Sequence, residues 1–196
     1  MRKSVLGAIF MALALPASAD PLMDGGHYYE QGDYVRALAV WQPLAQQGNA
    51  EAQNNLALLY LDGKGVPRNL PEAARYFQLS AAAGSALGQN NLGGLYRDGN
   101  GLARDYGKAA RWFAASASQG NSAGMYNLGL MYELGQGVKA DPLEAAMWYD
   151  LAAEQNDVPN AAAHRDALLQ AMPPVQRNKA RQMAVACRLS GYKSCG

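Results

Sequence analysis

The chain has 196 residues, of which 49% are hydrophobic and 17% are charged, with 17 basic and 16 acidic side chains. A net charge of +1 provides no basic excess for neutralising phosphates, which argues against a nucleic acid as partner. Beyond the first residues no apolar run of about 20 residues occurs, so the rest of the chain is not expected to insert into a membrane.

The first 19 residues have the pattern of a secretory signal peptide. Arg2 and Lys3 precede an apolar run over residues 5–15, and Ala17-Ser18-Ala19 is a small-residue cleavage site. Cleavage near Ala19 leaves 15 basic and 16 acidic side chains in the remaining chain. We therefore predict a periplasmic or secreted bacterial protein, with a short uncleaved anchor as the alternative.

Residues 20–47 are predicted to form an N-terminal helix pair. Asp33, Ala37 and Trp41 each precede a matching residue of the next unit by 36 positions, but the connection between the two helices is four residues shorter. Pro43 lies inside the second helix, where it removes one backbone donor and is expected to bend the helix.

Three units of 36 residues follow, with predicted bounds 48–83, 84–119 and 120–155. Gly48, Gly84 and Gly120 open these units. The other residues in step include Leu56, Leu92 and Leu128, then Tyr60, Tyr96 and Tyr132, and then Ala73, Ala109 and Ala145. A period of this length is typical of stacked helical repeats, whose extended surfaces usually bind other molecules.

Each unit is predicted to be a pair of antiparallel helices. In the first unit Asn49 caps one helix, and Gly63 ends it. Asn69 caps the second helix, and Glu72, three residues on, predicts a capping box. One aromatic position of the second helix is expected in the core, occupied by Tyr76, Trp112 and Trp148. Small residues mark two positions of close helix contact, namely Ala52, Gly88 and Gly124, and Ala57, Gly93 and Gly129.

Residues 156–196 are predicted to cap the end of the stack. A partial copy of the first helix ends before Pro173-Pro174, and a last helix follows. Cys187 and Cys195 both lie in the last ten residues. In an exported chain such a close pair favours a disulfide, with two free thiols as the alternative.

The repeated pattern resembles the Sel1-like repeat family, whose members are relatives of the tetratricopeptide repeats. The residues that carry the resemblance in the first unit, with counterparts in the next two, are Ala52, Leu56, Ala57, Tyr60, Gly63, Gly65, Val66, Ala73, Tyr76, Phe77 and Ala81. The resemblance implies an all-α fold, a right-handed α-solenoid of antiparallel helix pairs. It also implies an adaptor function, and exported bacterial members are often linked to envelope signalling or polysaccharide secretion.

By the same resemblance, the first helices would line a concave face that binds a partner. The inward-facing residues would be Asn54, Leu58, Leu61, Asn90, Gly94, Arg97, Tyr126, Leu130 and Glu133. This mixture of amide, charged and apolar groups suits an extended peptide or protein segment better than a drug-sized ligand. Asn55, Asn91 and Asn127 form a ladder that either binds backbone groups of such a peptide or bonds the next helix internally.

No catalytic residue, metal site or cofactor is predicted. The Gly-x-Gly segments follow a helix in every unit, so we interpret them as turns and not as phosphate-binding loops. His27 and His164 lie at opposite ends of an elongated stack, and we interpret both as surface or packing residues. The prediction is a monomeric, non-catalytic adaptor for a protein or peptide partner in the bacterial envelope.

Two other functions are compatible with the sequence. A branch of cysteine-rich secreted relatives has been associated with binding or cleaving β-lactams, so a cell-wall or β-lactam hydrolase is the alternative. That branch has a cysteine pair in each repeat, whereas the repeats of this chain have no cysteine. The other possibility is an assembly scaffold in which units stack between chains.

Overall fold

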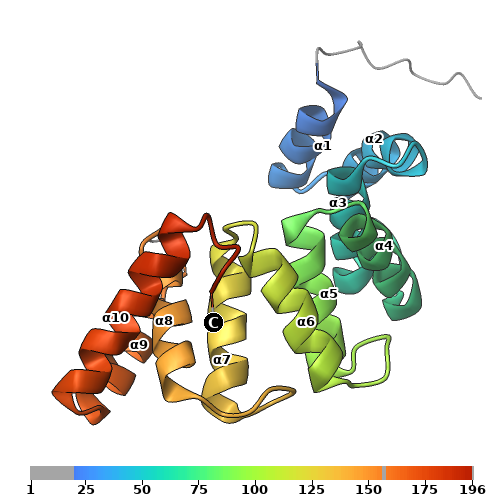
Figure 1. The fold of residues 1–196 in the computed structure, drawn as a ribbon. Coiled ribbons are helices and arrows are strands. Elements are labelled where there is room, and N and C mark those ends of the chain that lie inside the picture. Colours follow the sequence, from blue (N-terminus) through green and yellow to red (C-terminus); the bar gives the residue numbers. More distant parts are fainter. Residues whose placement is uncertain (1–19, 156–157, 196) are drawn as a thin grey trace, which may run out of the picture.

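The computed structural model describes residues 20–155 and 158–195, and all regular secondary structure in these ranges is helical. The ten helices are α1 (Pro21–Glu30), α2 (Tyr34–Gln46), α3 (Ala50–Asp62), α4 (Leu70–Ala82), α5 (Ala86–Asp98), α6 (Tyr106–Ala117), α7 (Ser122–Leu134), α8 (Pro142–Ala153), α9 (Ala161–Ala171) and α10 (Pro174–Leu189). Helices α1 to α8 pack as four successive pairs, and α9 and α10 both pack on α8 at the other end, which confirms the predicted α-solenoid (Figure 1). The signal peptide expected over residues 1–19 lies outside the described residues.

Helix ends lie where the capping residues predict them. The Asn49 side chain accepts a hydrogen bond from the backbone N–H of Ala52 at 2.9 Å, and Asn69 accepts one from that of Glu72 at 3.1 Å. Gly63 ends α3 in the left-handed conformation with φ 70°, which glycine adopts without steric cost. These local signals recur in each 36-residue unit, so the same helix pair forms three times.

The reciprocal half of the predicted capping box is absent at Asn69, so that part of the prediction is wrong. The backbone N–H of Asn69 donates to the carbonyl oxygen of Tyr60 at 2.9 Å, and Glu72 pairs instead with Arg75 at 2.8 Å. The next two units repeat the backbone bond, from Asp105 to Tyr96 at 2.8 Å and from Asp141 to Tyr132 at 3.1 Å. At Asn69, a backbone hydrogen bond between the two helices of the unit thus takes the place of the hydrogen bond to the Glu72 side chain that the capping box predicts.

The small residues inside the helices make room for side chains of the facing helix. A Cβ atom on Gly93 would lie 2.7 Å from the ring of Phe113, and one on Gly129 would lie 2.9 Å from the ring of Tyr149. At the other small position, a Cβ atom on Gly124 would lie 2.5 Å from Ser116 Oγ. A Cβ atom does not approach other atoms this closely in proteins, so any larger residue would force the facing side chain to shift.

The second glycine of each Gly-x-Gly turn contacts the preceding unit. A Cβ atom on Gly101 would lie 2.5 Å from the carbonyl oxygen of Leu70, the first residue of α4. The equivalent atom on Gly65 would lie 2.7 Å from the backbone of Tyr34, the first residue of α2. These turns therefore join neighbouring units, which supports their interpretation as structural.

The aromatic position of the second helix is buried in two units and half-buried in the third. Tyr76 and Trp148 belong to the core as predicted, but Trp112 is only half-buried. A surface hollow bounded by Tyr96, Lys108 and Arg111 exposes the rest of the Trp112 ring. Trp112 packs against a core cluster with part of its ring exposed, so the prediction that it is a core residue is confirmed only in part.

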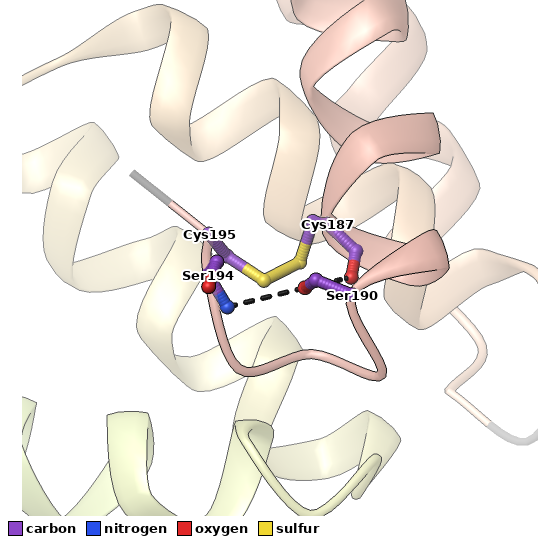
Figure 2. The surroundings of a disulfide bond; sticks show 4 residues. All are labelled: Cys187, Ser190, Ser194 and Cys195. Atoms are coloured by element: carbon purple, nitrogen blue, oxygen red, sulfur yellow. Dashed lines mark hydrogen bonds between the residues drawn. A yellow bond between two sulfur atoms is a disulfide. The ribbon is translucent and has the colours of Figure 1, made fainter.

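Helices α9 and α10 cover the C-terminal end of the core. Both pack on α8, and Ala184 and Cys187 of α10 are buried in the same cluster as Trp148. Cys187 and Cys195 form a disulfide (Figure 2). The hydroxyl of Ser190 donates to the carbonyl oxygen of Cys187 at 2.7 Å and accepts from the backbone N–H of Ser194 at 3.1 Å. The tail after α10 is therefore held by the disulfide and by local hydrogen bonds, which include one from the backbone N–H of Tyr192 to the carbonyl oxygen of Cys187 at 3.0 Å.

The N-terminal pair packs against the first repeat through an aromatic cluster. Trp41 is buried, its indole N–H donates to the carbonyl oxygen of Leu22 at 3.2 Å, and its ring lies against Gly25. The ring of Tyr29 lies 5.9 Å from that of Trp41, and its hydroxyl accepts from the Lys64 ammonium at 2.9 Å. Helix α2 continues through Pro43 to Gln46.

Candidate binding face

The first helices of the units lie next to one another along the stack. Helix α3 contacts α5, and α5 contacts α7, more extensively than α4 contacts α6 or α6 contacts α8. In a curved stack of helix pairs, the helices with the shorter spacing between units are those on the inner side. The face formed by α3, α5 and α7 is called the inner face below, and it contains the residues of the predicted site.

The inner face buries one of the predicted site residues and leaves the others accessible. Asn54 is 3% exposed. The remaining members are half-buried, and they are Leu58, Leu61, Asn90, Arg97, Tyr126, Leu130 and Glu133, together with Asn55, Asn91 and Asn127 of the ladder. A partner on this face would reach these side chains without separation of the helices. The Asn54 side chain is almost fully buried and could make little direct contact with a partner.

The asparagines form hydrogen bonds from one unit to the next. Asn91 Nδ2 donates to Asn54 Oδ1, and Asn127 Nδ2 donates to Asn90 Oδ1, both at 2.8 Å. Within each helix the adjacent amides are linked more weakly, with 3.3 Å from Asn54 to Asn55 and 3.4 Å from Asn90 to Asn91. The ladder therefore bonds to the neighbouring first helix, which is the internal role considered for it.

Arg97 extends this network toward α7. Its Nε and Nη2 atoms donate to the two carboxylate oxygens of Asp98 at 2.8 and 3.1 Å, and Nη1 donates to Asn127 Oδ1 at 3.0 Å. The Asp98 carboxylate raises the pKa of Arg97. The guanidinium is thus charged, oriented and only partly exposed, which are the features of a preorganised donor.

A second cluster lies at the C-terminal end of the inner face, where α7, α8 and α9 meet. The hydroxyl of Tyr149 donates to Glu133 Oε2 at 2.5 Å, and Nδ1 of His164 lies 3.4 Å from the same oxygen. His164 Nε2 lies 3.3 Å from the hydroxyl of Tyr126. Burial raises the pKa of both tyrosines, and the Glu133 carboxylate adds to the effect. Both tyrosine hydroxyls therefore keep their protons and can donate hydrogen bonds.

Two members of this cluster were missed from the sequence. Tyr149 occupies the position of Phe77 and Phe113, so its hydroxyl departs from the repeat and could have been noticed. His164 gave no such signal because it lies outside the repeats and 38 residues from Tyr126. In the structure it contacts two predicted site residues, so it is a packing histidine of the inner face.

The described residues contain little that suggests other chemistry. Over residues 20–155 and 158–195, no group of three or more His, Cys, Asp or Glu side chains could hold a metal ion. His164 hydrogen-bonds to a phenol and a carboxylate, and neither is the serine or cysteine nucleophile that acyl transfer usually needs. No helix in the described part of the chain is long and apolar enough to cross a bilayer.

Comparison with known proteins agrees with the repeat pattern. The sequence profile of the Sel1 repeat matches residues 50–85, 86–121 and 122–157. A solved Sel1 repeat protein from Oxalobacter formigenes has a TM-score of 0.61 and 32% sequence identity, over 67% of this chain and 98% of that chain.

A second solved structure, of a protective antigen present in uropathogenic Escherichia coli strains, displays an SLR fold. Its TM-score is 0.60 at 24% identity, over 88% of this chain and 46% of that chain, so it supports the fold alone. Three matched repeats cover more than half of the sequence, in the register that the helices have in the structure. The chain belongs to the Sel1 repeat family.

Proposed function

We propose that the protein is a non-catalytic adaptor of the bacterial envelope and that it binds an extended protein or peptide segment along the inner face. Sel1 repeat proteins are in general protein–protein interaction scaffolds. The envelope location and the use of the inner face for binding are inferred here from the residues of this chain. An adaptor needs a surface whose groups are already oriented before the partner arrives, because ordering them on binding weakens affinity.

The observation that carries the proposal is the continuous polar network on α3, α5 and α7. It runs from Asn54 through Asn91, Asn90 and Asn127 to Arg97, with each link a hydrogen bond. Apolar side chains at Leu58, Leu61 and Leu130 lie on the same helices. Alternating apolar and hydrogen-bonding groups match the needs of a peptide, whose backbone is polar and whose side chains are varied.

The envelope location is supported by the two ends of the chain. The first 19 residues have a signal-peptide pattern, and the only two cysteines are joined in a disulfide. Disulfides persist in oxidising compartments such as the bacterial periplasm and are rare in the cytosol.

The test is affinity capture from envelope extract with two matched triple variants. The inner-face variant carries Leu58→Glu, Arg97→Glu and Leu130→Glu. The control carries Leu79→Glu, Arg111→Glu and Gln78→Glu, which make the same charge change at exposed positions of α4 and α6. Each variant is first compared with the wild type by thermal unfolding, so that loss of the fold is recognised.

The expected result is a protein that the wild type and the control capture and that the folded inner-face variant does not. We expect at least a tenfold loss of affinity, because three apolar or hydrogen-bonding contacts would be replaced by unpaired charges. Capture by the inner-face variant but not by the control would place the interaction on the second helices and overturn the proposal.

A further inference from the structure

Gly94 occupies the middle of α5 without any packing reason for being glycine. The helix glycines at 88, 93, 124 and 129 each face a side chain that a Cβ atom would strike. A Cβ atom on Gly94 would meet nothing within 4 Å. Glycine weakens a helix relative to alanine, so neither the helix nor its packing explains glycine at this position.

The space beside Gly94 is a hollow in the inner face. The same position holds Leu58 in the preceding unit and Leu130 in the following one, and both of these side chains are half-buried. At Gly94 a hollow of about 200 Å³ remains, lined among others by Leu61, Asn90, Asn91, Arg97 and Asn127. This volume is smaller than that of sites for drug-sized ligands, and it suits a single side chain.

The polar groups around the hollow have more hydrogen-bond donors than their internal partners use. Each asparagine amide has two N–H groups, and Asn91 and Asn127 each donate one of them to a neighbouring asparagine. The terminal nitrogens of Arg97 also have two N–H groups each, of which Asp98 and Asn127 take one apiece. The oxygens of Asn90, Asn91 and Asn127 each accept one hydrogen bond and keep a second lone pair. Asn91, Asn127 and Arg97 each keep at least one N–H group for an acceptor that enters the hollow, which Asp98 also borders.

We propose that this hollow, the Gly94 subsite, receives a side chain of the partner that ends in a carbonyl or carboxylate oxygen. The inference rests on the proposed function and adds the chemistry of one contact. The absent side chain at position 94 admits the partner's side chain, and Asn91, Asn127 and Arg97 donate hydrogen bonds to its oxygen. Asp98 balances the charge of Arg97, so a neutral amide and a carboxylate share the required acceptor chemistry.

The test uses small probes and NMR spectroscopy of the purified full chain. The probes are the N-acetyl methylamides of L-glutamine, L-glutamate and L-norleucine, three side chains of similar length. The signals followed are the side-chain N–H groups of Asn91, Asn127 and Arg97. We expect glutamine, glutamate or both to shift these signals saturably, and norleucine to bind at least tenfold more weakly.

Two variants provide the control. Gly94→Leu restores the residue type of the equivalent positions, fills the hollow and is expected to abolish the response while raising the melting temperature. Gly26→Leu makes the same change in α1, where a Cβ atom also meets nothing within 4 Å, beside a different hollow that contains Glu30 and Trp41. This variant should respond to the probes as the wild type does.

The outcomes separate the subsite from the adaptor function. A response to glutamine alone identifies an amide as the preferred group, and a response to glutamate alone identifies a carboxylate. Equal binding of norleucine, no response to any probe, or an undiminished response in folded Gly94→Leu would overturn the subsite. In that case the capture experiment with the inner-face variant still decides the adaptor function independently.

Discussion

Gly93 and Gly94, which are adjacent in α5, have different surroundings. Gly93 lies against the ring of Phe113, at a distance that leaves no room for a Cβ atom. Gly94, one residue later, points toward the hollow of the inner face. At the scale of single residues, one glycine serves the packing of the stack and the other leaves space at its surface.

These positions should respond in opposite directions to the same substitution. Gly93→Ala is expected to lower the free energy of unfolding by about 1–3 kcal/mol, because Phe113 must shift to avoid an overpacked core. Gly94→Ala should raise it by up to about 1 kcal/mol, since alanine favours the helix and meets nothing. Denaturant unfolding of the two variants measures both changes. A similar loss of stability in both would show that Gly94 also has a structural role.

Among the elements, α10 differs from the repeats in what holds it in place. It has no partner helix of its own and packs on α8, where Ala180, Ala184 and Cys187 are buried. The segment that follows returns through the disulfide to Cys195, and Tyr192 reaches Gly120 at the end of α6. The end of the chain is therefore fastened to the third repeat.

Removing the disulfide should destabilise the protein without changing its fold. The bond closes a loop with a sequence separation of eight residues, for which the chain-entropy relation gives about 2–3 kcal/mol. The expected result is a loss of this size in the free energy of unfolding when Cys187 and Cys195 are both replaced by serine. Reducing agent should lower the stability of the wild type similarly and leave the double variant unchanged. An effect of reductant on the double variant would indicate another cause.

The whole molecule is a stack whose two ends are closed by different means. The pair α1 and α2 covers the first repeat through Trp41, and α9 with α10 covers the last through contacts with the buried face of α8 (Figure 1). A repeat stack without such ends exposes the interface that the next unit would have covered. The helices at each end thus cover the interfaces that another unit would contact.

Deleting residues 158–196 should expose Trp148, Leu151 and Met147, which are almost fully buried in the complete protein. We expect the shortened chain to unfold at a lower temperature and to associate at concentrations where the complete protein does not. Sedimentation and the binding of an apolar dye measure the two effects. An unchanged melting temperature and a monomeric mass would mean that the repeats need no cap at this end.

The sequence alone determined the helix pairs, their 36-residue period and their membership of a repeat family. These features depend on residues close together in the chain, such as Asn49 with Ala52 or the break at Gly63, and the period makes each signal appear three times. The disulfide was also predictable, because both cysteines are near neighbours in a chain whose first 19 residues have a signal-peptide pattern.

The tertiary structure decided which side chains face a partner and which face each other. Asn54 and Asn91 occupy adjacent positions of the repeat, yet Asn54 is buried as an acceptor while Asn91 donates to it across the units and borders the hollow. His164 joins Tyr126 and Glu133 only through the placement of α9. Trp112 is half-buried although Tyr76 and Trp148 at the equivalent positions are buried. Burial and hydrogen bonding between units depend on groups far apart in the sequence, and only their positions in space bring them together.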